Sequence, residues 1–130
     1  MYITRFTKTD KTAEDHLFHT EEEARNYLDR FINDDSGSYR NIAVIDKTMR
    51  VACILPFRNG RADKLINEGG CVRLRDKYSR PEERNDLYVV TNINEWSERI
   101  NISCINSDMF IKPTETVGIE MIETADSVSH

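Results

Sequence analysis

The sequence predicts an α+β protein of two small units: an N-terminal strand–helix–hairpin unit followed by a small β-barrel. A strongly amphipathic helical pattern occurs at residues 18–31, and alternating apolar patterns typical of strands flank it. From residue 70 onward, short strand patterns follow one another. Several short strands in succession are typical of small closed sheets, in which few strand edges are exposed.

The helix is predicted to begin after Thr20. This residue is a suitable N-cap, and Glu23 stands three residues later, which is the spacing of a capping box. The glutamates at 21–23 lie at the positive end of the helix dipole, where they stabilise the helix. Four apolar residues have the i, i+3, i+4, i+7 spacing of one helix face, namely Ala24, Tyr27, Leu28 and Phe31. Residues 34–38, DDSGS, end the helix.

Strands are predicted on both sides of this helix. Residues 2–8, YITRFTK, are rich in β-branched and aromatic residues, and residues 16–18 form a short second strand. After the helix, NIAVID and RVACILPF form a hairpin around a polar turn at residues 46–49. In the second hairpin strand, one face consists of Val51, Cys53, Leu55 and Phe57. Because an isolated hairpin is marginally stable in water, we expect this face to pack on the helix and to complete a β-α-β-β unit over residues 1–58.

A connector is predicted over residues 59–69. Asn59-Gly60 is a turn signal, and residues 62–68 have the composition of about two helical turns, ended by the glycines at 69 and 70. The second unit then spans residues 70–123, and residues 124–130 are expected to form a frayed tail.

Four segments build the predicted barrel. Residues 71–75, CVRLR, alternate between apolar and basic side chains. Two alternating runs, at 87–93 and 100–104, form a hairpin, and Ile100, Ile102 and Cys104 share the face of the returning strand. After a turn at Lys112-Pro113-Thr114, residues 117–123, VGIEMIE, are expected to form the last strand.

Composition limits the classes of function. No apolar run approaches the roughly 20 residues of a membrane span, and the first ten residues lack the apolar region of a secretory signal. The three cysteines, Cys53, Cys71 and Cys104, contain no C-x-x-C pair, which argues against a disulfide scaffold or a zinc knuckle. We therefore expect a cytoplasmic protein with no membrane association.

Reactive groups are sparse, and each has a simple structural alternative. His16 and His19 form D-H-x-x-H, and zinc accepts such ligands, but an extended chain points the two rings to different sides. Cys71 follows two glycines without a histidine nearby, and a nucleophilic cysteine needs a base and a lowered pKa. For His16 and His19 the alternative is a solvated helix-cap region, and for Cys71 it is a buried strand cysteine. The sequence therefore predicts a non-enzymatic protein with no metal and no cofactor.

Charge is distributed unevenly along the chain. Residues 58–84 carry eight basic and five acidic side chains, whereas residues 85–130 carry two basic and eight acidic ones. The basic strand and loop allow an alternative function, a nucleic-acid-binding accessory domain in which aromatic rings stack on bases. Its predicted contact residues are Arg73, Arg75, Lys77, Tyr78 and Tyr88. The net charge of −5 argues against this alternative, because nucleic-acid binding requires a basic surface.

Trp96, the single tryptophan, lies in the polar tip of the hairpin. Its ring either folds down as a lid or forms a contact tip, since tryptophan and arginine are over-represented among interface hot spots. The acidic residues toward the C-terminus either serve solubility or occupy a basic groove of a partner. The predicted partner-binding residues are Trp96, Glu95, Glu98 and Arg99 at the tip, and Asp108, Glu115, Glu120 and Glu123 on the acidic surface.

The segments GGCVRLRDKYSRPEERNDLYVVTNINEWSERINISCIN and KPTETVGIEMIE resemble Src-homology-3-like small β-barrels, in particular those of short accessory proteins of phages and mobile elements. The first half, FHTEEEARNYLDRF before a V-I-D hairpin, is similar to strand–helix–hairpin units of such proteins. The resemblance carries no catalytic residue across. It implies a protein-binding module that docks on a host or partner protein, and one specific form of this function is inhibition of a host defence nuclease, as anti-CRISPR proteins do.

Overall fold

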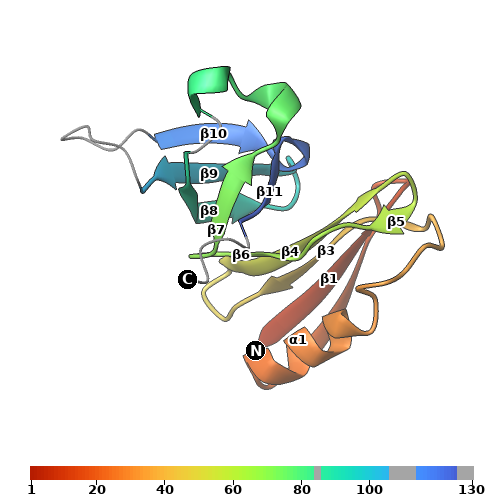
Figure 1. Cartoon of the computed structure of the whole chain (residues 1–130). Coiled ribbons are helices and arrows are strands. Elements are labelled where there is room, and N and C mark those ends of the chain that lie inside the picture. The colour runs from red at the N-terminus through yellow and green to blue at the C-terminus, as the bar shows by residue number, and fades with distance from the viewer. Residues whose placement is uncertain (84–85, 106–113, 126–130) are drawn as a thin grey trace. The chain divides into compact units, whose positions relative to one another are not determined.

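The computed structural model describes residues 1–83, 86–105 and 114–125 (Figure 1). The chain divides into two compact units, Met1–Ile66 and Asn67–His130. The division lies within the predicted connector. The described residues form antiparallel sheets and one α-helix, which confirms the α+β class.

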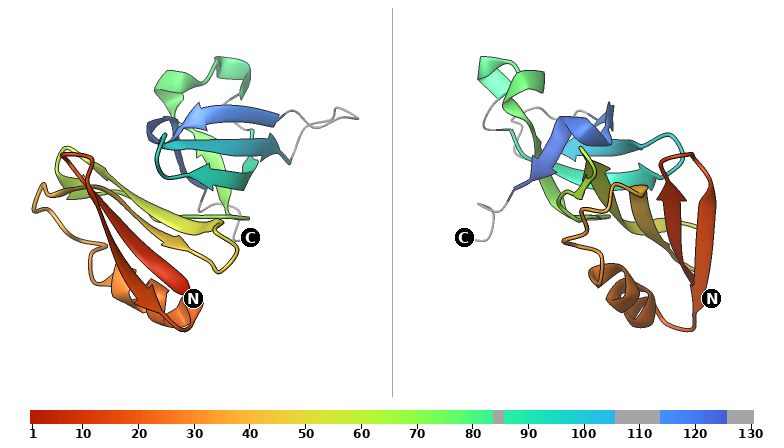
Figure 2. Two further views of the ribbon diagram at one scale, coloured as in Figure 1. Left: turned by 180° about the vertical axis from the view of Figure 1, so that it is seen from behind. Right: turned by 90° about the vertical axis from the view of Figure 1, so that its right-hand side faces the viewer.

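The first unit is a sheet with the strand order β2-β1-β3-β4-β5, and β6 also pairs with β4. Helix α1 lies on one face of this sheet, as Figure 1 and Figure 2 show. The bounds of these elements are β1 (Tyr2–Lys8), β2 (Ala13–Phe18), α1 (Glu21–Asp29), β3 (Tyr39–Ile45), β4 (Val51–Arg58), β5 (Arg61–Ala62) and β6 (Ile66–Asn67). The predicted strands, helix and hairpin of this unit are confirmed.

Helix α1 begins with the predicted capping box. The Thr20 hydroxyl accepts a hydrogen bond from the backbone N–H of Glu23 at 3.1 Å, and the Glu23 carboxylate accepts one from the N–H of Thr20 at 3.2 Å. Ala24 and Leu28 are fully buried, and the Thr4 hydroxyl of β1 donates to the Ala24 carbonyl at 2.9 Å. The cap thus fixes where the helix starts, and the buried stripe fixes which face meets the sheet.

The core of this unit surrounds Phe6. Its ring lies 4.9 Å from Phe31 and 5.7 Å from Tyr27, between ring centroids, in edge-to-face geometry. Other members of the core are Ala24, Leu28, Ile42, Val44, Cys53 and Leu55. Burying one such large apolar side chain contributes about 1.5–3 kcal/mol, so the helix stripe and the hairpin residues Cys53, Leu55 and Phe57 stabilise each other as predicted. The prediction fails at Val51, because a register shift there breaks the alternation and Ala52 packs against this core instead.

The predicted helical turns at residues 62–68 are wrong. Asn59 and Gly60 both have positive φ angles, 52° and 81°, which are the angles of a tight two-residue hairpin turn. The turn reverses the chain, so that Arg61 and Ala62 pair with Arg58 and Phe57. The residues that follow form a second short strand instead of a helix.

The second unit is a five-stranded antiparallel sheet with the order β10-β9-β8-β7-β11. In Figure 1, β7 and β11 run steeply across the direction of β9 and β10. The elements are β7 (Cys71–Leu74), the 3₁₀ turns η1 (Asp76–Tyr78) and η2 (Pro81–Glu83), β8 (Tyr88–Asn94), β9 (Arg99–Cys104), β10 (Thr114–Gly118), the 3₁₀ turn η3 (Ile119–Met121) and β11 (Ile122–Thr124).

This sheet is open, since its end strands β10 and β11 pair with β9 and β7 and not with each other. The second unit is thus not a closed barrel, and its likeness to a Src-homology-3-like barrel, closed or half-closed, stays a prediction. The predicted last strand over 117–123 is wrong, because η3 interrupts it and directs the chain from the edge beside β9 to the edge beside β7.

A bulge at Thr91 sets the direction of side chains along β8. Val90 pairs with Ile102 and Asn92 with Asn101, so Thr91 has no counterpart on β9. Such an extra residue shifts the alternation of side chains by one position. Tyr88 and Val90 are buried before the bulge and Ile93 after it, and the predicted face of Ile100, Ile102 and Cys104 is confirmed, with each residue at most 4% exposed.

Candidate functional site

The turn between β8 and β9 is held in place from two sides. The Asn94 side-chain oxygen accepts hydrogen bonds from the backbone N–H groups of Trp96 and Ser97, both at 3.0 Å. Glu98 has a positive φ of 55°, and its carbonyl accepts a bond from the N–H of Ile119 in η3 at 2.9 Å. These bonds attach the turn to its own strand and to the neighbouring 3₁₀ turn, so its backbone is pre-organised.

The turn exposes its tryptophan and buries its first acid. Trp96 is 58% exposed, whereas the neighbouring Glu95 is 8% exposed. This is the reverse of what the transfer energies of the two side chains favour. A ring that served as a lid would have most of its surface covered. Because more than half of Trp96 is exposed, the ring lies at the surface. Its role in binding a partner stays a prediction.

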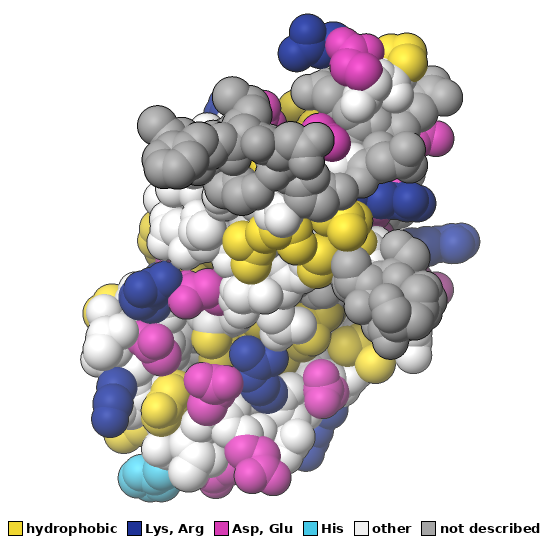
Figure 3. All heavy atoms as spheres, turned by 60° about the vertical axis from the view of Figure 1, so that its left-hand side comes forward, with side chains coloured by type: hydrophobic (Ala, Val, Ile, Leu, Met, Phe, Trp, Pro, Cys, Tyr) yellow, Lys and Arg dark blue, Asp and Glu magenta, His cyan; other side chains and the backbone are white. Residues whose placement is uncertain are grey.

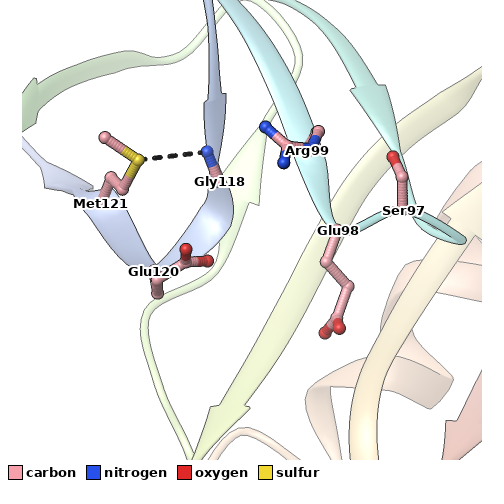
Figure 4. A pocket seen from close by; sticks show the side chains of 6 residues that line it. All are labelled: Ser97, Glu98, Arg99, Gly118, Glu120 and Met121. Atoms are coloured by element: carbon pink, nitrogen blue, oxygen red, sulfur yellow. Dashed lines mark hydrogen bonds between the residues drawn. The ribbon is translucent and has the colours of Figure 1, made fainter.

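A pocket of about 220 Å³ lies beside this turn (Figure 4). Pairing of Val117 with Ile100 and of Gly118 with Arg99 places the end of β10 against the start of β9. The lining residues are Ser97, Glu98, Arg99, Gly118, Glu120 and Met121. Three of the predicted partner-binding residues, Glu98, Arg99 and Glu120, are thus brought together, although about 20 positions separate the last from the first two.

Gly118 has a specific part in the shape of the pocket. A Cβ at this position would overlap the carboxylate of Glu120, and φ of Gly118 is −71°, which any residue adopts. A side chain at this position would therefore displace the flexible Glu120 carboxylate and change the pocket lining, without straining the backbone. The Gly118 N–H donates to the Met121 sulfur at 3.4 Å, and this bond closes η3 (Figure 4).

Arg99 is an exposed guanidinium in this lining. Within residues 1–83, 86–105 and 114–125 it makes no side-chain hydrogen bond and no ion pair. In Figure 4 its side chain points toward Gly118, while that of Glu98 points away from it. The pocket therefore presents hydrogen-bond donors and acceptors side by side, and its lining includes residues of the turn that carries Trp96.

The other predicted acidic residues lie elsewhere in this unit. Glu115 is half-buried on β10, opposite Ile102. Glu123 lies on β11 and accepts a hydrogen bond from Arg73 at 3.0 Å, with Arg75 at 3.9 Å from its second oxygen. Asp108 lies outside the described residues. The acidic residues thus occupy separate positions on the end strands and on η3.

The alternative nucleic-acid surface is largely engaged within the protein. Glu123 contacts both Arg73 and Arg75, and Tyr88 is 3% exposed, so its ring is not accessible to a base. Lys77 lies over the ring of Tyr78, 5.0 Å from its centroid. Acidic and basic side chains are interspersed on the face that Figure 3 shows. A nucleic acid would have to compete with Glu123 for both arginines.

The histidine and cysteine side chains each have structural surroundings of their own. His16 contacts Glu14 at 2.6 Å and packs against Phe6, and no group of three or more potential metal ligands occurs among the described residues. Burial raises the pKa of the Cys53 thiol to about 11. Cys71, predicted as a buried strand cysteine, is half-buried at the start of β7. These positions give no reactive cluster within the part of the chain that the structure describes.

Comparisons of the chain with protein-family models, with curated proteins and with solved structures find no match. In the described segments, no helix has the length and apolar character needed to cross a membrane. The functional proposal therefore depends on the geometry of the β8–β9 turn and its pocket.

Proposed function

We propose that this chain is a non-enzymatic protein-binding module that docks on a partner through Trp96 and the pocket beside it. The observation that carries the proposal is an indole 58% exposed on a turn held by Asn94 and by η3. A pre-organised backbone lowers the entropy lost on binding. An exposed tryptophan beside an arginine supplies the residue types that dominate interface energetics.

For the fold of the second unit, we propose a Src-homology-3-like barrel. Its support is the order of elements: β7, a long charged loop, the β8–β9 hairpin, β10, a 3₁₀ turn and a last strand that returns to β7. The steep crossing of β7 and β11 over β9 and β10 agrees with a strongly curled sheet (Figure 1). This is the arrangement that the resemblance implies, and with it goes the proposed origin in a phage or mobile element.

The partner in this proposal is a host protein with a basic surface, encountered in the cytoplasm. Residues 85–130 carry a net charge of −6, and Glu98 and Glu120 line the pocket. Acidic side chains of this kind favour a positively charged partner and raise the rate of encounter. A defence nuclease with a nucleic-acid groove has such a surface, so inhibition of a nuclease is the specific form that we propose.

The test compares capture by wild type, Trp96→Ala and a matched control, Met49→Ala. Met49 is 65% exposed at the tip of the β3–β4 hairpin in the first unit. Tagged proteins are incubated with a lysate of host cells, retained proteins are identified by mass spectrometry, and the affinity of the captured protein is measured. Loss of a central hot spot costs about 2 kcal/mol or more, which is about 30-fold in Kd. We expect this loss for Trp96→Ala alone.

A second variant tests the pocket independently of the indole. Gly118→Ala displaces the Glu120 carboxylate without backbone strain, so it should weaken capture while thermal unfolding stays near wild type. If Trp96→Ala and Met49→Ala bind the partner equally well, the docking surface is not at the β8–β9 turn.

A further inference from the structure

The outer side of β10 forms one edge of the sheet in the second unit. Among the described residues β10 pairs only with β9. Its side chains alternate between two faces. Thr114 and Thr116 are exposed on the outer face, whereas Glu115 lies opposite Ile102 and Val117 opposite Ile100 on the face of the core.

Glu115 is the unusual member of this core-facing row. Its neighbour across β9 is Ile102, which is fully buried, and the next residue in the row is Val90, 1% exposed. Half-burying a carboxylate beside aliphatic side chains carries a desolvation cost. Glu115 makes no ion pair or side-chain hydrogen bond with any described residue, so no partner within that part of the chain offsets the cost.

An apolar residue would suit this position better for the stability of one copy. With valine in place of Glu115, β10 would read Thr-Val-Thr-Val, an alternating run of β-branched residues with high strand propensity. An edge strand of that kind is a template for another strand, and natural sheets protect such edges with inward-pointing charges. The glutamate therefore lowers the stability of a single molecule and protects the edge strand from pairing with another molecule.

We propose that Glu115 prevents β10 from pairing with a strand of a second copy of this chain. A strand added at this edge would place its own row of side chains beside the carboxylate and remove much of its remaining water, which penalises an unpaired charge. A second β10 in antiparallel pairing would also bring a like charge into the same row. This inference goes beyond docking through Trp96 and does not depend on it.

The first unit has the same arrangement at its own end strand. Glu14 on β2 lies opposite Phe6, on the face that carries the core. Unlike Glu115, it has partners, His16 at 2.6 Å and Lys8 at 3.6 Å. A glutamate on the core-facing side of an end strand thus occurs in both units, and in the second unit no described residue neutralises it.

The test measures self-association of the full chain with Glu115→Val, and the matched control is Thr116→Val. The control adds the same side chain to the same strand on the outer face and leaves Glu115 in place. Molar mass is determined by light scattering over a wide range of concentration. Glu115→Val should at least double its apparent mass at high concentration, and its β10 amides should gain protection from hydrogen exchange. Wild type and Thr116→Val should keep one mass throughout.

Two further variants keep the test decisive. Glu115→Lys retains a charge at the edge and should behave as wild type. Glu115→Thr replaces Glu115→Val if circular dichroism shows that the valine variant is unfolded in dilute solution. The proposal is overturned if the folded uncharged variant keeps the wild-type mass at the highest concentration, or if Thr116→Val associates equally.

Discussion

Replacing Glu123 by glutamine tests whether this carboxylate masks a nucleic-acid-binding surface. Glu123 lies 3.0 Å from the Nε of Arg73 and 3.9 Å from an Nη of Arg75. The amide keeps the size of the side chain and removes its charge. We therefore expect the variant to fold, to lose a little stability and to free the Arg73 guanidinium from its ion pair, whereas Arg75 keeps a further interaction.

The stability change follows from the exposure of the three side chains. Glu123 is 31% exposed, Arg73 49% and Arg75 25%, so these are partly solvated ion pairs, each worth about 0.2–1 kcal/mol. The free energy of unfolding should fall by about 1 kcal/mol. β7 and β11 pair over three residues each, Val72–Leu74 with Ile122–Thr124. The loss should therefore appear first in the hydrogen-exchange protection of these two short strands.

The binding change follows from the number of arginines released. Each phosphate contact to a single strand contributes about 0.7 to the slope of log affinity against log salt. The release of Arg73 should therefore steepen the slope by about 0.7 in Glu123→Gln relative to wild type. Fluorescence anisotropy with a labelled oligothymidylate measures it. An unchanged slope in the folded variant would show that Glu123 masks no such surface.

Two further predictions concern the first unit. Thr20→Ala removes the N-cap hydroxyl and should lower the free energy of unfolding by about 1 kcal/mol, as measured by urea denaturation. Thr20→Ser keeps a capping hydroxyl and should retain most of the wild-type stability. An equal loss of stability in both variants would contradict the capping role. Burial raises the pKa of Cys53 from 9.0 to about 11, so folding favours the neutral thiol. The contribution of this thiol to the free energy of unfolding should be fully present below pH 9 and decline as the pH rises toward 11. Cys53→Ala should lack this pH dependence. With an alkylating reagent, the half-buried Cys71 should react before Cys53 and Cys104 in the folded protein, and simultaneous labelling of all three would refute the burial.

Local signals in the sequence predicted most of the first unit. The capping box at Thr20 and the stripe through Leu28 depend on residues within one or two helical turns, so the pattern alone contains them. The residues after Asn59-Gly60 show where local signals give a wrong prediction. Their composition permits a helix, but the tight turn brings Arg61 and Ala62 beside β4, and pairing with an existing strand outweighs a weak helix propensity.

The pocket could be predicted only in part. Glu98 and Arg99 follow from their place in a hairpin tip. Gly118 and Met121 join them through the register of β9 and β10 and through η3, neither of which has a local signal. No local sequence pattern predicts the bulge at Thr91 either, although the bulge determines which of the following β8 residues face the core.

In the part of the chain that the structure describes, several turns share one feature, a side-chain oxygen that accepts the backbone N–H two residues later. Asp10, Asp34, Asp46 and Asn94 are acceptors of this kind. Hydrogen bonding lowers the pKa of Asp10 and Asp46 below 3.8, so their turns are stabilised above that pH and loosen as acid protonates them. Asn94 is an amide and has no proton to gain. Strong acid should thus relax these turns of the first unit, whereas the Asn94 side chain still accepts the backbone N–H groups of Trp96 and Ser97.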